Sequence, residues 1–465
     1  MTRAVDRSPR VGVVGLGYMG LATALAFGAR GIRVVGYDVQ PSVRSAVARG
    51  RSPYREAGLS RLLRSQVRSG RLRVVDRPEA LVQAVEGIFI CVPTPGRRGG
   101  RIDLRPLERS LREVGQALGS VDDYRVVVVK STVVPGTTDA VVRPALERYS
   151  QRASGSLGLA ANPEFLAEGS MVHDALFPDR IVIGTHDDRA LAWLRRVYRP
   201  FRAPIVVLSP SGAELTKYAS NAFLALKVSF ANEMARLADR LGVSVDLVMD
   251  AVGRDPRIGR EFLRAGPGFG GSCFGKDVSA LVARAKELGL EFRTGAAALR
   301  TNEEQLEYAL DLVRRTAGPL AGKRVALLGL AFKAGTDDVR DSRALPIAER
   351  LLDEGATVRG HDPVALESFR RAWQQSAYAH RPGLELQSTV EQALRDVDVA
   401  ILQADWPAYH RWKRDWSRRM RNPLIIDLRR SLDRASARRA GATVIGLGAG
   451  DSTASAHPET PGGHR

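Results

Sequence analysis

The sequence predicts an α/β protein with two Rossmann-like, doubly wound domains that are joined by a long central helix. A glycine fingerprint lies between a strand pattern and a helix pattern near the N-terminus, and a second series of alternating strands and helices begins near Lys323. Between them, a helical pattern runs from Ala213 to Leu241 without proline or glycine. The 465 residues, 44% of them hydrophobic, are enough for two or three domains with real cores.

The first domain opens with a dinucleotide-binding pattern. Residues 10–39 read as strand, glycine turn, helix and strand, with Gly15, Gly17 and Gly20 in GxGxxG spacing and Asp38 at the end of the second strand. The glycines allow a tight turn, and the helix N-terminus would face a pyrophosphate. Asp38 can accept hydrogen bonds from a ribose diol and would repel a 2′-phosphate, which favours NAD over NADP. The alternative is a glycine-rich turn that binds no ligand.

The remaining strands of this domain alternate at first with helical segments, which predicts a mostly parallel sheet covered on both faces. The strand patterns are VEGIFICVPTP, YRVVVVKSTV, LGLAANPEF and DRIVIG. Loops that follow parallel strands meet at the carboxyl edge of the sheet, where ligands bind. We therefore expect residues 93–95, 131–132 and 162–168 to gather at this ligand-binding edge.

The central segment from Ser211 to Leu241 reads as one helix of about 28 residues, too long for an ordinary surface helix and suited to joining two lobes. More helices should follow up to about Gly318. The second α/β series lacks GxGxxG and reads GLAFK instead, so it predicts a different kind of nucleotide site.

The segment 266–277, GPGFGGSCFGKD, contains one of only two cysteines. The four glycines that precede the cysteine, at 266, 268, 270 and 271, would let a ligand approach closely. Cys273 should lie just before a helix N-terminus and beside Lys276, and both features lower a thiol pKa and favour the nucleophilic thiolate. The alternative is a small buried cysteine in a tight turn.

A polar pair marks the central helix. Lys217 and Asn221 are four residues apart and share one helical face, which suits them to holding an oxygen that becomes negatively charged. The alternative is a solvated polar face. Lysine is rare here, with eight lysines against 62 arginines, so a lysine can mark a site that needs a compact ammonium. Lys130 is interpreted as a strand-end lysine, for which no chemical role is expected.

Together these features indicate a reaction type. Oxidation of an alcohol to an aldehyde requires NAD but no cysteine. An enzyme that carries the aldehyde on to an acid needs a nucleophile, which forms a thiohemiacetal and then a thioester that water hydrolyses.

Four long motifs resemble the UDP-glucose/GDP-mannose dehydrogenase family: NPEFLAEGS, ELTKYASNAFLALKVSFANE, GPGFGGSCFGKD and LAFKAGTDDVRDS. The resemblance runs from about residue 10 to 448, with all motifs in the family's order. NAFLALKVSF and FPDRIVIG are most similar to the bacterial UDP-glucose branch. The resemblance implies oxidation of UDP-glucose to UDP-glucuronate with NAD.

The resemblance also implies catalytic roles. Cys273 matches the nucleophile, Lys217 and Asp277 match the pair that removes the hydroxyl proton with a water, and Asn221 matches the amide that assists the oxyanion. Thr132 matches the threonine that holds the water. Glu164 matches the carboxylate assigned to thioester hydrolysis.

Binding residues are carried over in the same way. The cofactor side is implied to comprise Gly15, Gly17, Tyr18, Met19, Gly20, Asp38, Thr94, Thr132, Glu168, Lys276 and Arg340. The substrate side is implied to comprise Glu164, Phe165, Leu166, Lys217, Asn221, Arg257, Phe262, Leu263, Gly270, Lys333 and Arg429, with Arg257 offered across a homodimer. One departure is Gly275, where relatives often carry proline; it removes no functional group.

The implied domains are an NAD-binding Rossmann domain (1–205), a central helical domain with the catalytic Lys and Cys (206–317) and a UDP-sugar-binding domain (318–450). The polar residues 451–465 are expected to be disordered.

Composition limits other functions. Two cysteines cannot form a disulfide framework, which indicates a reducing cytoplasm, and the seven histidines lack metal-ligand spacing, so no metal is expected. The net charge of +19 permits nucleic-acid or membrane binding, but the basic residues are scattered and we expect neither partner.

Three alternatives stay open. One is a GDP-mannose or other nucleotide-sugar 6-dehydrogenase, and a more distant one is a non-catalytic nucleotide-sugar sensor, which need not keep all of the catalytic residues. The third is a basic Rossmann protein that binds nucleic acid.

Overall fold

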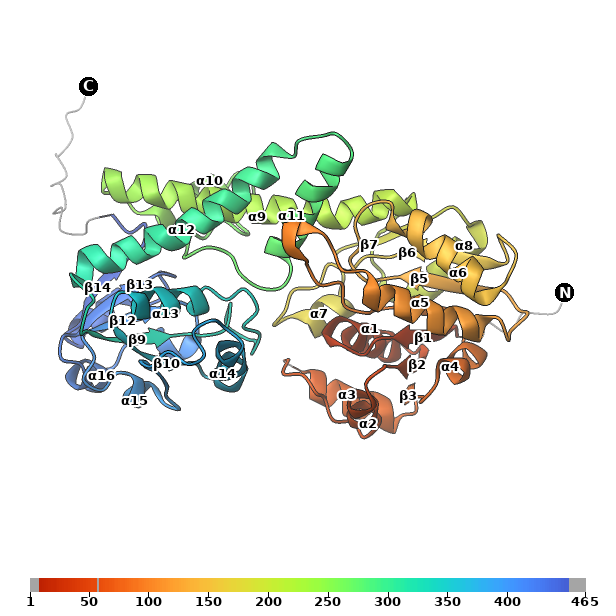
Figure 1. Cartoon of the computed structure of the whole chain (residues 1–465), viewed down its shortest axis with the longest axis horizontal. Helices are drawn as coiled ribbons and strands as arrows, with labels where there is room; N and C mark the ends of the chain where they lie inside the picture. The colour runs from red at the N-terminus through yellow and green to blue at the C-terminus, as the bar shows by residue number, and fades with distance from the viewer. Residues whose placement is uncertain (1–7, 57, 451–465) are drawn as a thin grey trace, which may run out of the picture. The chain divides into compact units, whose positions relative to one another are not determined.

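The computed structural model describes residues 8–56 and 58–450. The chain forms two compact units (Figure 1). The first comprises the residues up to Asn221 together with Lys276–Phe292, and the second comprises Ala222–Gly275 and the residues from Arg293 onward. The predicted fold class is confirmed, whereas the division into three domains stays a prediction. The tail 451–465 lies outside the described residues.

The first unit is built on an eight-stranded sheet in the order β3-β2-β1-β4-β5-β6-β7-β8. Neighbouring strands are parallel except β6 and β7, which are antiparallel. The order of the first six strands is that of a dinucleotide-binding Rossmann sheet. The strands are β1 (Arg10–Val14), β2 (Arg33–Tyr37), β3 (Leu72–Val74), β4 (Gly87–Ile90), β5 (Arg125–Val129), β6 (Leu157–Ala161), β7 (Ile181–Thr185) and β8 (Ile205–Leu208).

Helices cover both faces of this sheet, so β1, β4 and β5 are almost continuously apolar and buried. Helices α1, α3 and α8 pack on one face, and α4, α5 and α6 pack on the other. The bounds are α1 (Tyr18–Ala29), α2 (Pro41–Ala48), α3 (Leu59–Arg68), α4 (Pro78–Ala84), α5 (Arg105–Leu118), α6 (Arg143–Ser150), α7 (Met171–Leu176) and α8 (Asp188–Tyr198).

The predicted central helix is α9 (Pro210–Leu241), which has 32 residues. It begins earlier than predicted, at Pro210, because the first turn of a helix tolerates proline. The chain passes from the first unit to the second within α9 and returns to the first in α11 (Phe274–Glu287). The other helices of this segment are α10 (Val245–Gly253) and α12 (Arg293–Ala317). Across the described residues, no helix combines the length and apolar character needed to cross a bilayer.

The second unit contains a six-stranded parallel sheet in the order β11-β10-β9-β12-β13-β14. Its strands are β9 (Arg324–Leu328), β10 (Thr357–His361), β11 (Leu384–Leu386), β12 (Val399–Leu402), β13 (Leu424–Asp427) and β14 (Thr443–Gly446). Its further helices are α13 (Ala344–Asp353), α14 (Leu366–Gln374), α15 (Val390–Ala393), α16 (Arg414–Arg419) and α17 (Arg434–Arg439). The predicted strands correspond to β9, β10, β12 and β13.

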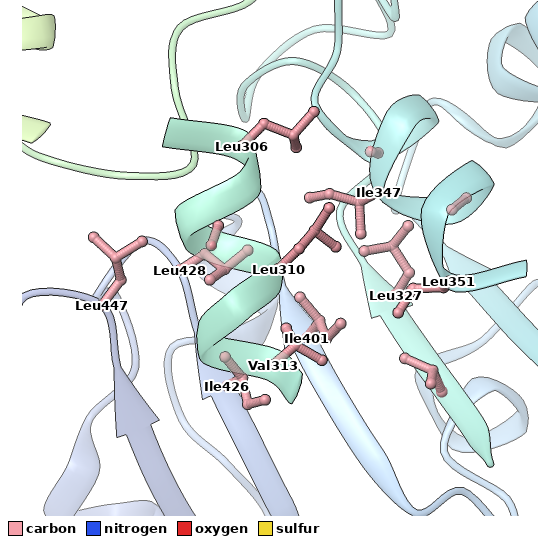
Figure 2. Packing of buried hydrophobic residues seen from close by; sticks show 14 of the residues in the cluster. Leu306, Leu310, Val313, Leu327, Ile347, Leu351, Ile401, Ile426, Leu428 and Leu447 are labelled. Carbon is pink, nitrogen blue, oxygen red and sulfur yellow. The ribbon is translucent and has the colours of Figure 1, made fainter. Parts of the chain in front are cut away.

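The core of the second unit joins α12 to this sheet (Figure 2). Leu310 and Val313 of α12 belong to one buried cluster with Leu327 of β9, Ile401 of β12 and Ile426 of β13. The other face of the sheet packs against α15, α16 and α17 through a separate cluster. The helical segment 293–317 is therefore an integral part of the C-terminal fold.

Truncation of this core should be strongly destabilising. Leu310 is 1% exposed, so Leu310→Ala leaves a cavity and should lower the free energy of unfolding by about 2–5 kcal/mol. Leu288→Ala, at a leucine that is 60% exposed, is the matched control and should change it by less than about 0.5 kcal/mol. Urea unfolding followed by circular dichroism measures both, and equal effects would contradict the packing described here.

Candidate active site

The glycine turn after β1 has the geometry that a dinucleotide requires. Gly15 has φ +89°, and a Cβ there would lie 2.7 Å from the Cys91 carbonyl oxygen. A Cβ at Gly20 would lie 1.9 Å from the Gly15 carbonyl oxygen. A Cβ at Gly17 would meet no described atom within 4 Å. Two of the glycines are thus needed for packing, and the third leaves open space for a ligand.

The groups around this turn fit NAD. Helix α1 starts at Tyr18, directly after Gly17, and among the described residues no side chain caps its N-terminus. Its first N–H groups can therefore bind a pyrophosphate. The Asp38 carboxylate follows β2 and is oriented by the N–H groups of Leu16 at 2.7 Å and Gln40 at 2.8 Å. Its remaining lone pairs suit a ribose diol.

A loop between α2 and α3, which the sequence analysis did not identify, adds to this region. The Tyr54 ring lies 4.3 Å from the Tyr18 ring, centroid to centroid. The Glu56 carboxylate accepts hydrogen bonds from the N–H groups of Gly169 at 3.0 Å and Met171 at 2.9 Å. The loop thus connects the glycine turn to the segment that follows Glu164. The hydrogen-bond partners of Glu56 are more than 100 positions away in the sequence, so no local sequence pattern predicts its role.

The loops after β4 and β5 meet as predicted. The Thr94 hydroxyl donates to the Thr132 carbonyl oxygen at 2.6 Å. Thr132 and Lys217 line a small pocket with Val129, Ser131, Val133, Ala161, Pro163 and Glu214. Its volume of about 10 Å³ is the space that one water requires. A threonine hydroxyl and a lysine ammonium there can orient a water.

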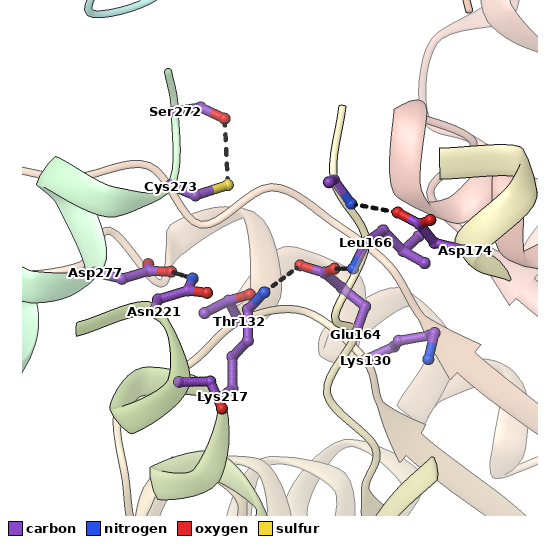
Figure 3. Close-up of polar contacts among 12 residues, drawn as sticks. Lys130, Thr132, Glu164, Leu166, Asp174, Lys217, Asn221, Ser272, Cys273 and Asp277 are labelled. Carbon is purple, nitrogen blue, oxygen red and sulfur yellow. Dashed lines mark hydrogen bonds and ion pairs between the residues drawn. The ribbon is translucent and has the colours of Figure 1, made fainter. Parts of the chain in front are cut away.

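An ion pair links the loop after β6 to α9 (Figure 3). The Lys217 ammonium lies 3.0 Å from Glu164, and both side chains are almost fully buried. The Leu166 N–H donates to the same carboxylate at 2.5 Å. Burial would raise the pKa of Glu164, but Lys217, the Leu166 N–H and Lys130 outweigh it and hold the pKa below its usual value. Glu164 is therefore a buried carboxylate that stays ionised.

A second polar contact links α9 to α11. The Asn221 amide donates to the Asp277 carboxylate at 2.7 Å, and Asp277 is 1% exposed. Lys276 forms an ion pair with the same carboxylate. Lys217 and Asn221 are both buried, which contradicts the alternative of a solvated polar face. The first unit thus brings together Glu164, Lys217, Asn221 and Asp277.

Neighbouring residues support this group. The Phe165 ring lies 4.1 Å from the Arg180 guanidinium carbon and 5.7 Å from the Lys217 ammonium. Glu168 is half-buried on the same loop. Glu214, which the sequence analysis missed, is one helical turn before Lys217 and accepts hydrogen bonds from the N–H groups of Gly136 and Thr138. The sequence signal that could have identified Glu214 is its spacing of three residues from Lys217, which places both side chains on one side of the helix.

Cys273 belongs to the second unit and directly precedes α11, as predicted. Its Sγ lies 3.6 Å from the Ser272 hydroxyl (Figure 3). The glycines before it are required by close packing within this unit. A Cβ at Gly270 would lie 2.2 Å from the Asp341 carbonyl oxygen, and Gly271 has φ +83° and packs against Phe332.

The same loop is anchored by polar groups. Asn302 accepts from the Phe269 N–H at 2.7 Å, Gln305 donates to the Gly266 carbonyl at 2.8 Å, and Arg343 donates to the Phe269 carbonyl at 3.0 Å. Cys273 therefore follows a segment of fixed geometry.

Cys91 differs from Cys273. It is buried at the end of β4, and burial raises the pKa of its thiol to about 12, so the thiol stays protonated. Cys273 is partly exposed. Only Cys273 is accessible to a reactant.

The implied substrate residues of the second unit include two strongly constrained ones. Phe262 has φ +64° and packs against Phe274 with ring centroids 6.0 Å apart. Arg429 donates to the Gln403 carbonyl at 2.7 Å, and burial lowers its pKa to about 10, so its guanidinium stays charged. Leu263 is buried and Lys333 lies near the Phe332 ring.

Arg257 and Arg340 each form an ion pair with a carboxylate two residues earlier, Asp255 and Asp338. Their implied roles stay predictions. Among the described residues, no group of three or more His, Cys, Asp or Glu side chains could hold a metal ion.

The fold and the glycine turn define an NAD-dependent oxidoreductase. Residues 9–202, 211–304 and 326–434 match the NAD-binding, central and UDP-binding domains of the UDP-glucose/GDP-mannose dehydrogenase family. The chain belongs to this family, which confirms the resemblance.

Individual relatives are similar over most of their length. UDP-glucose 6-dehydrogenase AglM of Haloferax volcanii is 39% identical over 428 residues, which are 91% of this chain and 97% of that protein. A UDP-glucose dehydrogenase structure from Pyrobaculum islandicum is 41% identical with a TM-score of 0.88 and covers 97% of this chain and 99% of its own. A UDP-D-ManNAc dehydrogenase structure from Pyrococcus horikoshii is 29% identical with a TM-score of 0.82 and covers 94% of this chain and 99% of its own.

Asp38 should set both affinity and selectivity for the cofactor. Asp38→Asn removes the negative charge and should weaken NAD binding about 10-fold, because a charge-assisted hydrogen bond contributes about 1.5–3 kcal/mol. The preference for NAD over NADP should narrow. Asp76→Asn, just beyond the adjacent strand β3, is the control because its side chain is 93% exposed. Titration calorimetry measures both, and an unchanged NAD affinity in Asp38→Asn would contradict the assignment.

Proposed function

We propose that this protein oxidises UDP-glucose to UDP-glucuronate with two equivalents of NAD. The observation that carries the proposal is the buried group of Glu164, Lys217, Asn221 and Asp277, which lies in the same unit as an NAD-binding turn. An alcohol oxidation needs groups that take up a hydroxyl proton and stabilise the resulting oxyanion, and this group offers both. The relatives named UDP-glucose dehydrogenases support the choice of substrate.

The proton transfer would involve Lys217 and Asp277. With a water held by Thr132, they take the proton of the sugar 6-hydroxyl, and Lys217 and Asn221 stabilise the developing oxyanion. Bound NAD supplies the acceptor for the hydride of carbon 6, once in each of two oxidations. The first oxidation leaves an aldehyde. Cofactor contacts from Thr94, Glu168, Lys276 and Arg340 are part of the proposal.

Cys273 would carry the second half of the reaction. Its thiolate adds to the aldehyde carbon and forms a C–S bond, giving a thiohemiacetal after the oxygen takes a proton. Loss of a hydride and a proton converts the thiohemiacetal to a thioester. A water activated by Glu164 then adds to the thioester carbon, the C–S bond breaks, and the thiolate and the carboxylate product are released. Glu164 suits this role because it stays ionised.

The nucleotide sugar would be held by the residues 262–271, Lys333 and Arg429, whose cationic side chains suit a diphosphate. Phe165 and Leu166 would contact the sugar. Another nucleotide sugar is the second candidate, and the similarity to a UDP-D-ManNAc dehydrogenase favours it.

We further propose that the protein is a homodimer. Phe223, Phe230 and Leu237 of α9 are exposed large apolar residues spaced seven residues apart, so they form one stripe on the part of the helix that belongs to the second unit. In a homodimer, a second copy of the chain would cover this stripe, and Arg257 would reach across that interface.

A charge in this stripe should disrupt the dimer. Phe230→Glu should convert the protein to a monomer, because an unpaired carboxylate in an apolar interface is strongly unfavourable. Leu288→Glu, at an exposed residue directly after α11, is the control and should leave the dimer intact. Sedimentation velocity decides, and a monomeric wild type or a dimeric Phe230→Glu variant would contradict the proposal.

The stoichiometry of NADH tests the reaction. We expect about two NADH per UDP-glucose at 340 nm, because each of the two oxidations reduces one NAD. Two NADH with another nucleotide sugar alone would change the substrate and keep the mechanism. One NADH per sugar would contradict the role of Cys273.

Cys273→Ser should abolish net acid formation and leave NAD binding intact, because the variant cannot form the thioester. Cys91→Ala is the control and should retain the stoichiometry of the wild type. Normal turnover by Cys273→Ser would refute covalent catalysis.

A further inference from the structure

Lys130 is a buried lysine at the candidate site that the proposed reaction does not use. It directly follows β5, where strand pairing aligns it with Asn162 after β6, because Val129 and Ala161 are register partners. Its N–H donates to the Ile90 carbonyl of β4 at 3.0 Å. Cys91, Lys130 and Asn162 therefore occupy equivalent positions at the carboxyl edge of three neighbouring strands. This is the edge from which the Glu164 loop extends.

The ammonium of Lys130 is bound to Asn162. It donates to the Asn162 side-chain oxygen at 3.0 Å and to its carbonyl oxygen at 3.3 Å. The Tyr198 hydroxyl donates to the same side-chain oxygen at 2.5 Å, and the Asn162 amide donates to the Val182 carbonyl at 2.7 Å. Asn162 is thus fixed by groups from two neighbouring strands, β5 and β7, and from helix α8. It stands two residues before Glu164, so its position sets where the Glu164 loop begins.

A charged lysine at this buried position carries a desolvation penalty, which favourable interactions of the charge must offset. Lys130 is 8% exposed, and burial lowers the pKa of its ammonium to about 8 despite the opposing effects of Cys91 and Glu164. At neutral pH the ammonium is still charged. A methionine or leucine would fill similar volume without this desolvation penalty.

The charge acts on Glu164. The titratable groups that face Lys130 are Cys91 after β4, Glu164 after β6, Lys217 of α9 and Tyr198 of α8. The neighbours Cys91 and Tyr198 stay neutral, since burial raises the pKa of each. The two lysines repel one another, and Glu164 is the carboxylate that both attract. Lys217 forms the direct ion pair, and Lys130 adds a second positive charge from the sheet.

We propose that Lys130 is a positioning residue that fixes the start of the Glu164 loop through Asn162 and helps to keep the Glu164 carboxylate ionised. The proposal rests on the proposed role of Glu164 in thioester hydrolysis. It assigns two separable tasks to one side chain, a hydrogen bond and a charge. A merely space-filling lysine would have neither.

Two substitutions separate the tasks. Lys130→Met removes both the hydrogen bond and the charge, whereas Lys130→Gln keeps an amide donor for Asn162 and removes only the charge. Lys286→Met is the matched control, because Lys286 is an exposed lysine of the same unit. Glu164→Gln identifies which limb of the pH profile belongs to Glu164.

The first readout is the pH dependence of kcat with UDP-glucose and NAD. In both Lys130 variants the acid limb should move to higher pH by about half a unit or more, because a nearby positive charge that favours the ionised carboxylate is lost. At neutral pH, kcat should fall about 10-fold or more in Lys130→Met, with KM for UDP-glucose within about 3-fold. Lys286→Met should match the wild type. An acid limb that stays in place in both Lys130 variants would overturn the charge task.

The second readout is hydrogen–deuterium exchange of the 162–171 segment, which does not depend on activity. Exchange should be faster in Lys130→Met and near the wild-type rate in Lys130→Gln. Unchanged exchange in Lys130→Met would overturn the positioning task. If the wild type oxidises no nucleotide sugar, the proposed function fails, and the exchange comparison still decides whether Lys130 fixes the loop.

Discussion

The candidate site of the first unit depends on the buried ion pair between Lys217 and Glu164. Breaking a buried pair by removing one partner leaves an uncompensated charge and is strongly destabilising, so the loop after β6 and the first half of α9 must keep one relative position. One helical turn further, Asn221 holds Asp277 of α11. This contact gives a reason why the chain returns to the first unit at Lys276. The parts of the unit that are far apart in the sequence thus meet at polar contacts, which specify position more narrowly than apolar packing does.

Glycine serves two different purposes in the two motifs that dominate the sequence. In the turn after β1, Gly17 leaves open space in front of a helix N-terminus, which is what a bound pyrophosphate needs. In the loop before Cys273, Gly270 and Gly271 are needed because Asp341 and Phe332 of the same unit pack directly against them. The second loop is rigid by packing, so the cysteine that follows it has a defined position without any bound ligand.

Much of the fold could be predicted because it is recorded in local patterns. GxGxxG between strand and helix marks the first sheet, and the proline- and glycine-free run marks α9. The strands β3, β8, β11 and β14 were not predicted; each has only three or four residues, and short runs give little periodicity. Of the site, Lys217, Asn221 and Asp277 could be predicted because they lie in recognisable motifs.

Glu56 and Lys130 could not be predicted, because their partners are brought close only by the fold. The second sheet repeats a structural feature of the first sheet that no sequence motif predicts. Asp362 after β10 accepts from the Leu330 N–H at 2.7 Å, as Asp38 does from the Leu16 N–H. Asp362 also accepts from Trp406 of its own unit, so its lone pairs serve the fold.

The central claim is that Glu164 acts on an intermediate held by Cys273. The most direct measurement is intact-protein and peptide mass spectrometry of Glu164→Gln after mixing with UDP-glucose and excess NAD. If Glu164 activates the hydrolytic water, an acyl adduct should accumulate on the peptide that contains Cys273 and should be absent from the Cys91 peptide. A Glu164→Gln variant that turns over normally, or that is inactive with no adduct on Cys273, would contradict this account.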